Sequence, residues 1–273
     1  MQRRHQRAEK APFSGQHLLH NKRIIRDMIA IAEVTGADTV LDIGAGKGAI
    51  TMPLAEIAGK VVAIENDRQF ADVLRAKSDC YPNVVIIQKD FLQTRMPREP
   101  FCVVANIPYA ITTPILEKLL CPVANGFQKG VLMIEKGAAK RFTARPTADP
   151  RILAWKMWHE LEFVAGVSRN HFATPPRVDS ALVRIRRKAS PAIRNADYYR
   201  FRALAEFGLQ YPVRPMAEAL RAVFTPPQIK HLARNLGVDR LTPIGTLQER
   251  QWADVFHTMI RYVEPHRWPA SGK

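Results

Sequence analysis

The chain has 273 residues, 47% of them hydrophobic, and its 41 Lys and Arg outnumber 25 Asp and Glu to give a formal net charge of +16. This length and apolar content suffice for a real core, which excludes global disorder and allows one large domain or a large one with a small one. The positive charge favours a polyanionic partner such as nucleic acid over a merely solubilising basic surface.

The sequence also disfavours a membrane protein, a disulfide-stabilised fold and a zinc site. No apolar run approaches the ~18 residues of a membrane span. The basic segment 1–10 lacks the apolar stretch of a secretory signal, although an Arg-rich, acid-poor start leaves a transit peptide open. Cys80, Cys102 and Cys121 are too few and too scattered for a disulfide framework or a zinc site. We therefore expect a cytoplasmic protein with reduced thiols and no metal.

Short apolar runs alternate with helical patterns after a basic N-terminal arm at residues 1–14. The runs, each typical of a buried strand of a parallel sheet, span residues 39–43, 60–65, 83–88, 101–106 and 130–135. Apolar residues at helical spacing lie between them, at 24–35, 67–78 and 112–120. This alternation predicts a doubly wound, Rossmann-like α/β sheet with right-handed crossovers.

The pattern changes towards the C-terminus. Two further strands, near 160–167 and 180–187, have little helix between them and can close the sheet edge as an antiparallel hairpin. They bring the mostly parallel sheet to seven strands. After Pro191 helical spacing is broken by prolines and no strand pattern survives. We therefore expect an α/β domain over 15–190 and a small all-helical domain over 191–273.

The most informative local motif is Asp42-Ile-Gly-Ala-Gly-Lys-Gly48, at the end of the first predicted strand. Gly44 and Gly46 allow a tight turn and a close approach of a ligand to the backbone. Glu65 ends the second strand, where a carboxylate can accept both hydroxyls of a ribose. The spacing fits the dinucleotide fingerprint loosely. Strand, glycine turn, helix, strand and acidic end follow in this order, which favours a nucleoside ligand over a purely structural turn. The role of Lys47 stays open: it either pairs with phosphate or is a solvated residue at the helix start.

Asp90 follows the third predicted strand. At the carboxyl edge of an open α/β sheet, where ligands bind, its carboxylate can accept the amino group of an adenine. The alternative is a turn or helix-capping aspartate.

The tetrapeptide Asn106-Ile-Pro-Tyr109 ends the fourth strand and separates a methyltransferase from a dehydrogenase. With it, the segments Gly15–Leu19, Asp42–Ala49, Ala63–Asp67, Asp90–Phe91 and Phe172–Ser180 resemble the rRNA adenine N6-methyltransferases, and among them closely the Erm family. The similarity runs from residue 15 to about 187. Erm enzymes methylate an adenine of 23S rRNA and confer resistance to macrolide, lincosamide and streptogramin antibiotics.

The resemblance implies a class I S-adenosylmethionine-dependent methyltransferase fold. It implies S-adenosylmethionine as cofactor, unassembled 23S rRNA as partner, a catalytic domain over 15–190 and RNA binding by the helical domain. No large apolar stripe is left over, so we expect a monomer.

The chemistry of the tetrapeptide can be argued from its residue types. The exocyclic amine of adenine is a poor nucleophile because its lone pair is delocalised into the ring. The Asn106 side-chain oxygen and the Ile107 carbonyl can each accept a hydrogen bond from one N–H of this amine, which localises the nitrogen lone pair. Pro108 stiffens the turn, and Tyr109 can stack on a base extruded from its helix, an interaction of about 1–3 kcal/mol.

The resemblance implies further site residues. Phe172 completes the pocket of the target base, with a loop-anchoring aromatic as the alternative. The cofactor contacts are His17, Leu19, Gly44, Glu65, Asp90 and Asn106. Basic candidates for RNA phosphates are the N-terminal arm, then Lys140, Arg141, Arg145 and Arg151, and the strand end Arg184, Arg186, Arg187 and Lys188. The alternative for the strand end is a charged edge facing solvent.

Other functions remain to be weighed. The small-subunit rRNA dimethyladenosine transferases share nearly every motif, and His17, Ile107 and Ala110 favour the Erm family over them. An adenine-specific DNA methyltransferase normally has proline where Ile107 stands. A non-catalytic RNA-binding relative would not need to keep every pocket residue, and here all are present.

Overall fold

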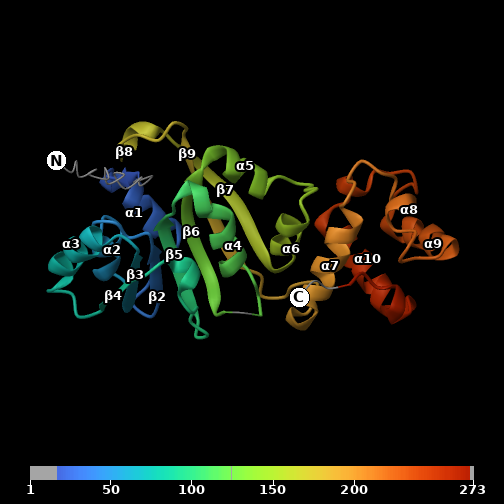
Figure 1. Cartoon of the computed structure of the whole chain (residues 1–273), viewed down its shortest axis with the longest axis horizontal. Helices are drawn as coiled ribbons and strands as arrows, with labels where there is room; N and C mark the ends of the chain where they lie inside the picture. The colour runs from blue at the N-terminus through green and yellow to red at the C-terminus, as the bar shows by residue number, and fades with distance from the viewer. Residues whose placement is uncertain (1–16, 124, 271–273) are drawn as a thin grey trace, which may run out of the picture.

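The computed structural model describes residues 17–123 and 125–270. It consists of a sheet with helices on both faces and a group of helices beyond one end of the sheet (Figure 1). The basic arm expected at residues 1–14 lies outside the described residues. No helix in the described part of the chain is long and apolar enough to cross a membrane.

A mixed sheet of seven strands forms the centre, in the order β4-β3-β2-β5-β6-β9-β7. Its strands are β2 (Thr39–Ile43), β3 (Lys60–Glu65), β4 (Val84–Gln88), β5 (Phe101–Asn106), β6 (Phe127–Glu135), β7 (His159–Val167) and β9 (Ser180–Arg187). Neighbours from β4 to β6 are parallel, and β9 runs antiparallel to both β6 and β7. The predicted seven-stranded, mostly parallel sheet with an antiparallel closing hairpin is confirmed.

Helices cover both faces because the strand residues alternate between two apolar cores. Val103 of β5 packs with α4 (Thr112–Leu119), α5 (Lys136–Thr143) and α6 (Pro150–Trp158). Val104, one residue on, packs on the other face with α1 (Lys22–Ile31) and α2 (Thr51–Ala55). This two-sided burial explains why the central strands are continuous apolar runs.

Local capping sets several helix starts. Asp67 accepts a hydrogen bond from the Phe70 amide at 3.1 Å and caps the start of α3 (Arg68–Ser78), which covers the helical pattern expected at 67–78. The side chain of Asn21 accepts from two backbone amides and begins α1 at Lys22, two residues before the predicted start. That helix ends at Ile31 rather than Thr35, and Glu33 then adopts a φ of 52°.

One prediction about the sheet is wrong. The run 83–88 was expected to be buried on both faces, but β4 is the edge strand of the sheet. Among the described residues no strand lies beyond β4, so its side chains are partly exposed, and Val85 retains 42% of its accessible surface. Helices α5 and α6 were not predicted either.

The C-terminal region is helical, as predicted. It contains α7 (Tyr198–Gly208), α8 (Met216–Ala219), α9 (Pro226–Leu236) and α10 (Glu249–Tyr262). Within residues 191–270 no strand forms, and one isolated bridge joins Pro215 to Pro243. The core of this region includes Leu153 and Trp158 of α6, so α6 packs against both the sheet and the helical region.

A small two-stranded sheet lies apart from the main one. β1 (Leu18–Leu19) pairs antiparallel with β8 (Phe172–Ala173), with Leu19 opposite Phe172. This β1–β8 ribbon joins the start of the described chain to the loop before β9, which the sequence did not predict. It also brings His17 to the carboxyl end of the parallel strands, where the candidate site lies.

Candidate active site

The glycine motif forms a tight turn between β2 and α2. Gly44, Gly46 and Gly48 all have positive φ, at 72°, 54° and 86°. A Cβ at Gly48 would lie 2.7 Å from Cδ1 of Leu74. Only glycine adopts this backbone at low cost, so the turn expected from the motif is confirmed.

Glu65 lies beside this turn as the last residue of β3, with 1% of its surface exposed. Its Oε2 accepts a hydrogen bond from the Gly46 amide at 2.7 Å, and its Oε1 accepts from the Asp67 amide at 2.8 Å. The carboxylate is therefore fixed by backbone amides from both sides. It stands where the ribose contact was expected.

A cavity of about 500 Å³ opens at the ends of β2, β3 and β4. Its lining includes Gly44, Glu65, Asp90, Phe91, Tyr109 and Ile115. Oδ1 of Asp90 accepts a hydrogen bond from the Leu92 amide at 2.8 Å and begins the 3₁₀ turn η1 (Phe91–Gln93). Asp90 is thus both a capping residue and a wall of the cavity, so the two interpretations of its sequence position are compatible.

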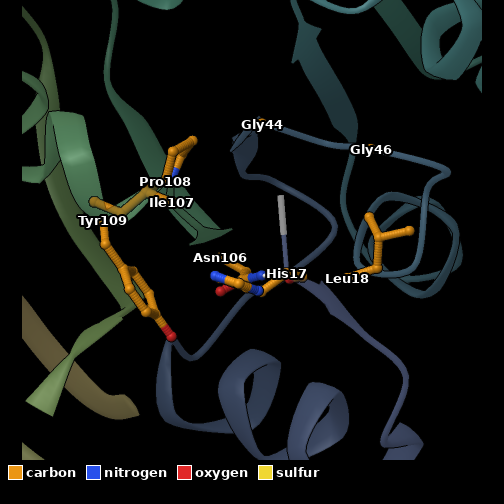
Figure 2. A pocket seen from close by; sticks show the side chains of 8 residues that line it. All are labelled: His17, Leu18, Gly44, Gly46, Asn106, Ile107, Pro108 and Tyr109. Carbon is orange, nitrogen blue, oxygen red and sulfur yellow. Dashed lines mark hydrogen bonds between the residues drawn. The ribbon is translucent and has the colours of Figure 1, made fainter. Parts of the chain in front are cut away.

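Asn106 ends β5 and points into a second, smaller cavity of about 30 Å³, lined also by His17, Gly44, Pro108 and Tyr109 (Figure 2). Its Nδ2 donates a hydrogen bond to the backbone carbonyl of His17 at 2.8 Å. Its Oδ1 is buried and has no hydrogen-bond partner among the described residues. A buried polar atom without a partner costs about 1–3 kcal/mol, which marks Oδ1 as an acceptor for a ligand.

Tyr109 begins the 3₁₀ turn η2 (Tyr109–Ile111), directly before α4. Its hydroxyl is hydrogen-bonded to the hydroxyl of Ser180, and its ring centroid lies 5.7 Å from that of His17. Burial raises the pKa of Tyr109, so the phenol stays neutral at physiological pH. Ser180 was missed as a site residue, because only the fold brings the start of β9 to the end of β5.

The β1–β8 ribbon holds the remaining predicted residues. His17 Nδ1 lies 2.7 Å from the Thr174 carbonyl. Leu19 is buried and lines a third cavity, of about 280 Å³, together with Gly44 and Asn106. Phe172 is also buried, packs into the core beneath the ribbon, and lines none of the three cavities.

Asp42 is a further residue whose role the sequence did not indicate. It is buried beneath the glycine turn, lines the third cavity and accepts a hydrogen bond from the Thr51 hydroxyl at 2.7 Å. Burial raises its pKa to about 7, and the neighbouring Glu65 adds to the rise. Lys47 lines the same cavity, with Nζ 5.4 Å from the centroid of the Phe70 ring.

The basic candidates divide into two groups. Lys140 lines an open groove of about 550 Å³ with Lys136, Arg169 and Arg177, none of which was singled out from the sequence. In this groove Lys136 is ion-paired with Asp179, and Arg169 donates to the Arg177 carbonyl. Arg141 lies 4.9 Å from the centroid of the Phe142 ring. The other candidates are bound to groups elsewhere in the chain. Ion pairs join Arg145 to Glu249, Arg151 to Asp149, Arg184 to Glu162, Arg186 to Glu33 and Lys188 to Glu249, and Arg187 donates to the Pro122 carbonyl. The charged-edge alternative therefore accounts for the contacts of the strand-end cluster.

Comparison with known proteins identifies the family. The chain matches the family model described as "Ribosomal RNA adenine dimethylase" over residues 7–261. The chain belongs to this family. A Bacillus licheniformis protein named rRNA adenine N-6-methyltransferase is 48% identical, over 98% of this chain and 93% of the relative.

Two other proteins show the range of the similarity. The crystal structure of the 23S rRNA methyltransferase ErmE superposes with a TM-score of 0.79 at 27% identity, over 89% of this chain and 100% of ErmE. A ribosomal RNA small subunit methyltransferase A of Thermotoga petrophila is 32% identical, over 83% of this chain and 87% of the relative. The chain is therefore an rRNA adenine N6-methyltransferase with S-adenosylmethionine as its methyl donor.

The residues at the carboxyl edge fit this donor. A cavity of about 500 Å³ is large enough for a nucleoside. A buried carboxylate, Glu65, and an acidic turn residue, Asp90, lie in its wall. Asn106 adds a buried acceptor next to the glycine turn.

Proposed function

We propose that the chain methylates N6 of a specific adenine in 23S rRNA and thereby confers resistance to macrolide, lincosamide and streptogramin B antibiotics. The 48% identity to the Bacillus licheniformis methyltransferase and the likeness to ErmE support this substrate. The single observation that supports the mechanism is the side chain of Asn106: its amide nitrogen donates to the His17 carbonyl, while its oxygen is buried and has no partner in the part of the chain that the structure describes.

In this proposal Asn106 and Ile107 prepare the target amine. The Asn106 Oδ1 accepts one N–H of the adenine amine and the Ile107 carbonyl accepts the other, which localises the nitrogen lone pair. Bound S-adenosylmethionine supplies a methyl group that its sulfonium makes electrophilic. The chain then acts mainly by positioning the nitrogen in line with that methyl, and the amine proton leaves to water after transfer.

Aromatic side chains hold the extruded base. Tyr109 stacks on it, with the phenol kept in place by Ser180. Phe172 is buried under the ribbon, where it lies opposite Leu19, so it supports the base pocket from beneath rather than lining it. Glu65 binds the donor's ribose and Asp90 its adenine. His17, Leu19 and Gly44 bind the methionine end of the donor; Leu19 and Gly44 line the third cavity and His17 the second.

The RNA is held by charge. The groove of Lys136, Lys140, Arg169 and Arg177 lies next to Ser180, since Asp179 is also in its wall. We place RNA phosphates there, with residues 191–273 as a further RNA-binding domain beside a catalytic domain of 15–190. Raising the salt concentration should weaken RNA binding steeply, and an affinity that stays flat across a salt titration contradicts this placement. The proposal includes a cytoplasmic monomer that acts on unassembled precursor RNA.

The test uses purified protein, labelled S-adenosylmethionine, and protein-free 23S and 16S rRNA in parallel. We expect label at one adenine of the 23S RNA, located by mass analysis of fragments, and erythromycin resistance in cells that produce the protein. Label confined to 16S RNA would refute the 23S assignment. It would support a small-subunit methyltransferase instead, the second candidate favoured by the 32% identity to the Thermotoga petrophila protein.

A further inference from the structure

Lys118 is a partly buried residue of α4, and its ammonium group forms all of its hydrogen bonds with one loop. Nζ donates hydrogen bonds to the backbone carbonyls of Phe91 at 2.7 Å, Leu92 at 2.7 Å and Thr94 at 2.5 Å. It also lies 5.0 Å from the centroid of the Phe91 ring. An ammonium has three N–H donors, so all of them are directed at the chain segment that follows Asp90.

This lysine joins two walls of the largest cavity of the site. Phe91 and Asp90 form one wall from η1, while Ile111 and Ile115 form another from η2 and α4. Ile115 is fully buried and lies one helical turn before Lys118. The bonds of Lys118 therefore fix the distance between the adenine-binding turn and the helix that follows the catalytic tetrapeptide.

The orientation of Asp90 depends on the same turn. Its Oδ1 accepts the Leu92 amide at 2.8 Å, and its backbone carbonyl accepts the Thr94 hydroxyl at 3.0 Å. Leu92 and Thr94 are two of the residues whose carbonyls Lys118 holds. Partial burial lowers the pKa of Lys118, and the negative charge of Asp90 opposes that shift. Moving the turn would move the carboxylate with it.

We propose that Lys118 is a positioning residue for the adenine subsite of the methyl donor, and that it makes this subsite selective for a purine with a 6-amino group. The inference rests on the proposed function, in which Asp90 accepts that amino group. A 6-keto purine presents an oxygen there, which repels the carboxylate. Lys118 contacts neither purine directly; it sets where Asp90 stands.

The experiment measures the binding of two product analogues by calorimetry. S-adenosyl-L-homocysteine carries the 6-amino group and S-inosyl-L-homocysteine carries a 6-keto group in its place. The variants are Lys118→Met, which keeps the aliphatic length but has no donors, and Lys118→Arg. The matched control is Lys129→Met. Lys129 also donates to a backbone carbonyl, that of Glu33 at 2.5 Å, but from the opposite end of the sheet.

In Lys118→Met we expect S-adenosyl-L-homocysteine to bind about tenfold more weakly, which corresponds to about 1.4 kcal/mol. The affinity for the inosyl analogue should fall much less, so the ratio of the two affinities, which measures the preference for the 6-amino purine, should approach one. The KM for S-adenosylmethionine should rise by a similar factor while kcat at saturation changes less than about threefold. Lys118→Arg should retain part of the preference for S-adenosyl-L-homocysteine over the inosyl analogue. The control Lys129→Met should retain the full wild-type preference.

The same measurements distinguish failure of this inference from misfolding of a variant and from failure of the proposed function. A purely structural role would weaken both analogues equally and leave their ratio unchanged, and that result in folded Lys118→Met overturns the inference. If Lys118→Met does not fold, a wild-type ratio in Lys118→Arg overturns it, because a guanidinium cannot reproduce the three bonds of the ammonium. Wild-type protein that binds neither analogue would instead contradict the proposed function itself.

Discussion

The side chain of Asn106 has two polar atoms, and one hydrogen bond decides which of them is left for a ligand. Because Nδ2 is bound to the His17 carbonyl, Oδ1 is the atom that remains in the cavity. The acceptor role of Asn106 was expected from its residue type. The contact that orients it was not, since it joins residues 89 positions apart in the chain.

Replacing Asn106 by Ala should abolish most methyl transfer and leave the fold intact. The variant loses the acceptor for the target amine, so we expect kcat to fall by about 100-fold or more, the usual effect of removing one preorganised hydrogen-bond partner. The variant also loses the hydrogen bond from Nδ2 to the His17 carbonyl, but it no longer buries the unpaired Oδ1, so the two effects partly cancel and the melting temperature should fall only by a few degrees. Methyl incorporation into rRNA, the RNA dissociation constant and the melting temperature are the measurements. Undiminished turnover would remove Asn106 from its proposed role.

The hydrogen bond between Tyr109 and Ser180 can be tested by a double-mutant cycle. Tyr109→Phe and Ser180→Ala each remove it, and each should lower kcat/KM by about fivefold, since a single neutral hydrogen bond is worth about 1 kcal/mol. The double variant should be no worse than either single variant, because the same bond is lost in all three. Additive losses would show that the two hydroxyls act independently.

At the scale of elements, strand positions follow closely from the sequence. The central strands are apolar runs with sharp polar or glycine ends, so β2, β3 and β5 match the expected residues. The edge position of β4 could not be deduced, because a run of Val and Ile looks the same with or without a neighbour. The β1–β8 ribbon has only two residues in each strand, which is too short for a periodic pattern.

Helix α6 was missed for a different reason. Nearly every residue of α6 is buried, including Ile152, Trp155 and Trp158, so the helix lacks the polar face on which a 3.6-residue pattern depends. Ser180 and Lys118 could not be predicted either, because each acts through a partner that only the fold brings near: Tyr109 for Ser180, and the loop after Asp90 for Lys118. By contrast, Gly44, Glu65, Asp90 and Asn106 all stand at strand ends, where the sheet itself predicts a site.

The glycine turn provides a test at this scale. Gly48→Ala places a Cβ in a positive-φ backbone and 2.7 Å from the buried Leu74. Gly237→Ala is the control, with a φ of 65° and nothing within 4 Å of its Cβ. Both should lose about 1–2 kcal/mol of unfolding free energy from backbone strain, and Gly48→Ala about 1 kcal/mol more from overpacking. Urea unfolding measures both, and equal losses would contradict the clash.

At the scale of the whole molecule, one buried histidine links stability to acid. His159, at the start of β7, has 1% of its surface exposed, and its ring centroid lies 5.9 Å from that of Phe127. Burial lowers its pKa to about 4 from an ordinary 6.5. The neutral ring is therefore favoured in the folded state, and its stabilising contribution is complete above pH 6.5.

As pH falls from 7 to 4, the unfolded chain binds a proton at His159 that the folded chain resists. The wild type should therefore lose up to about 3 kcal/mol of unfolding free energy that His159→Gln does not lose. Urea unfolding of both proteins at a series of pH values measures this difference. If the difference in unfolding free energy between wild type and His159→Gln does not change with pH, burial does not lower the pKa of His159 in the folded protein.

The helix α6 has a consequence for how the chain can be divided. Trp155 faces the sheet, and Trp158 contacts Tyr198 and Phe201 of α7. A cut after residue 190 would leave Leu153, Met157 and Trp158 as a bare apolar surface on the larger fragment. Such a surface promotes aggregation. The helical region therefore shields an apolar surface of α6, and the fragment that ends at residue 190 should be less soluble than the full chain.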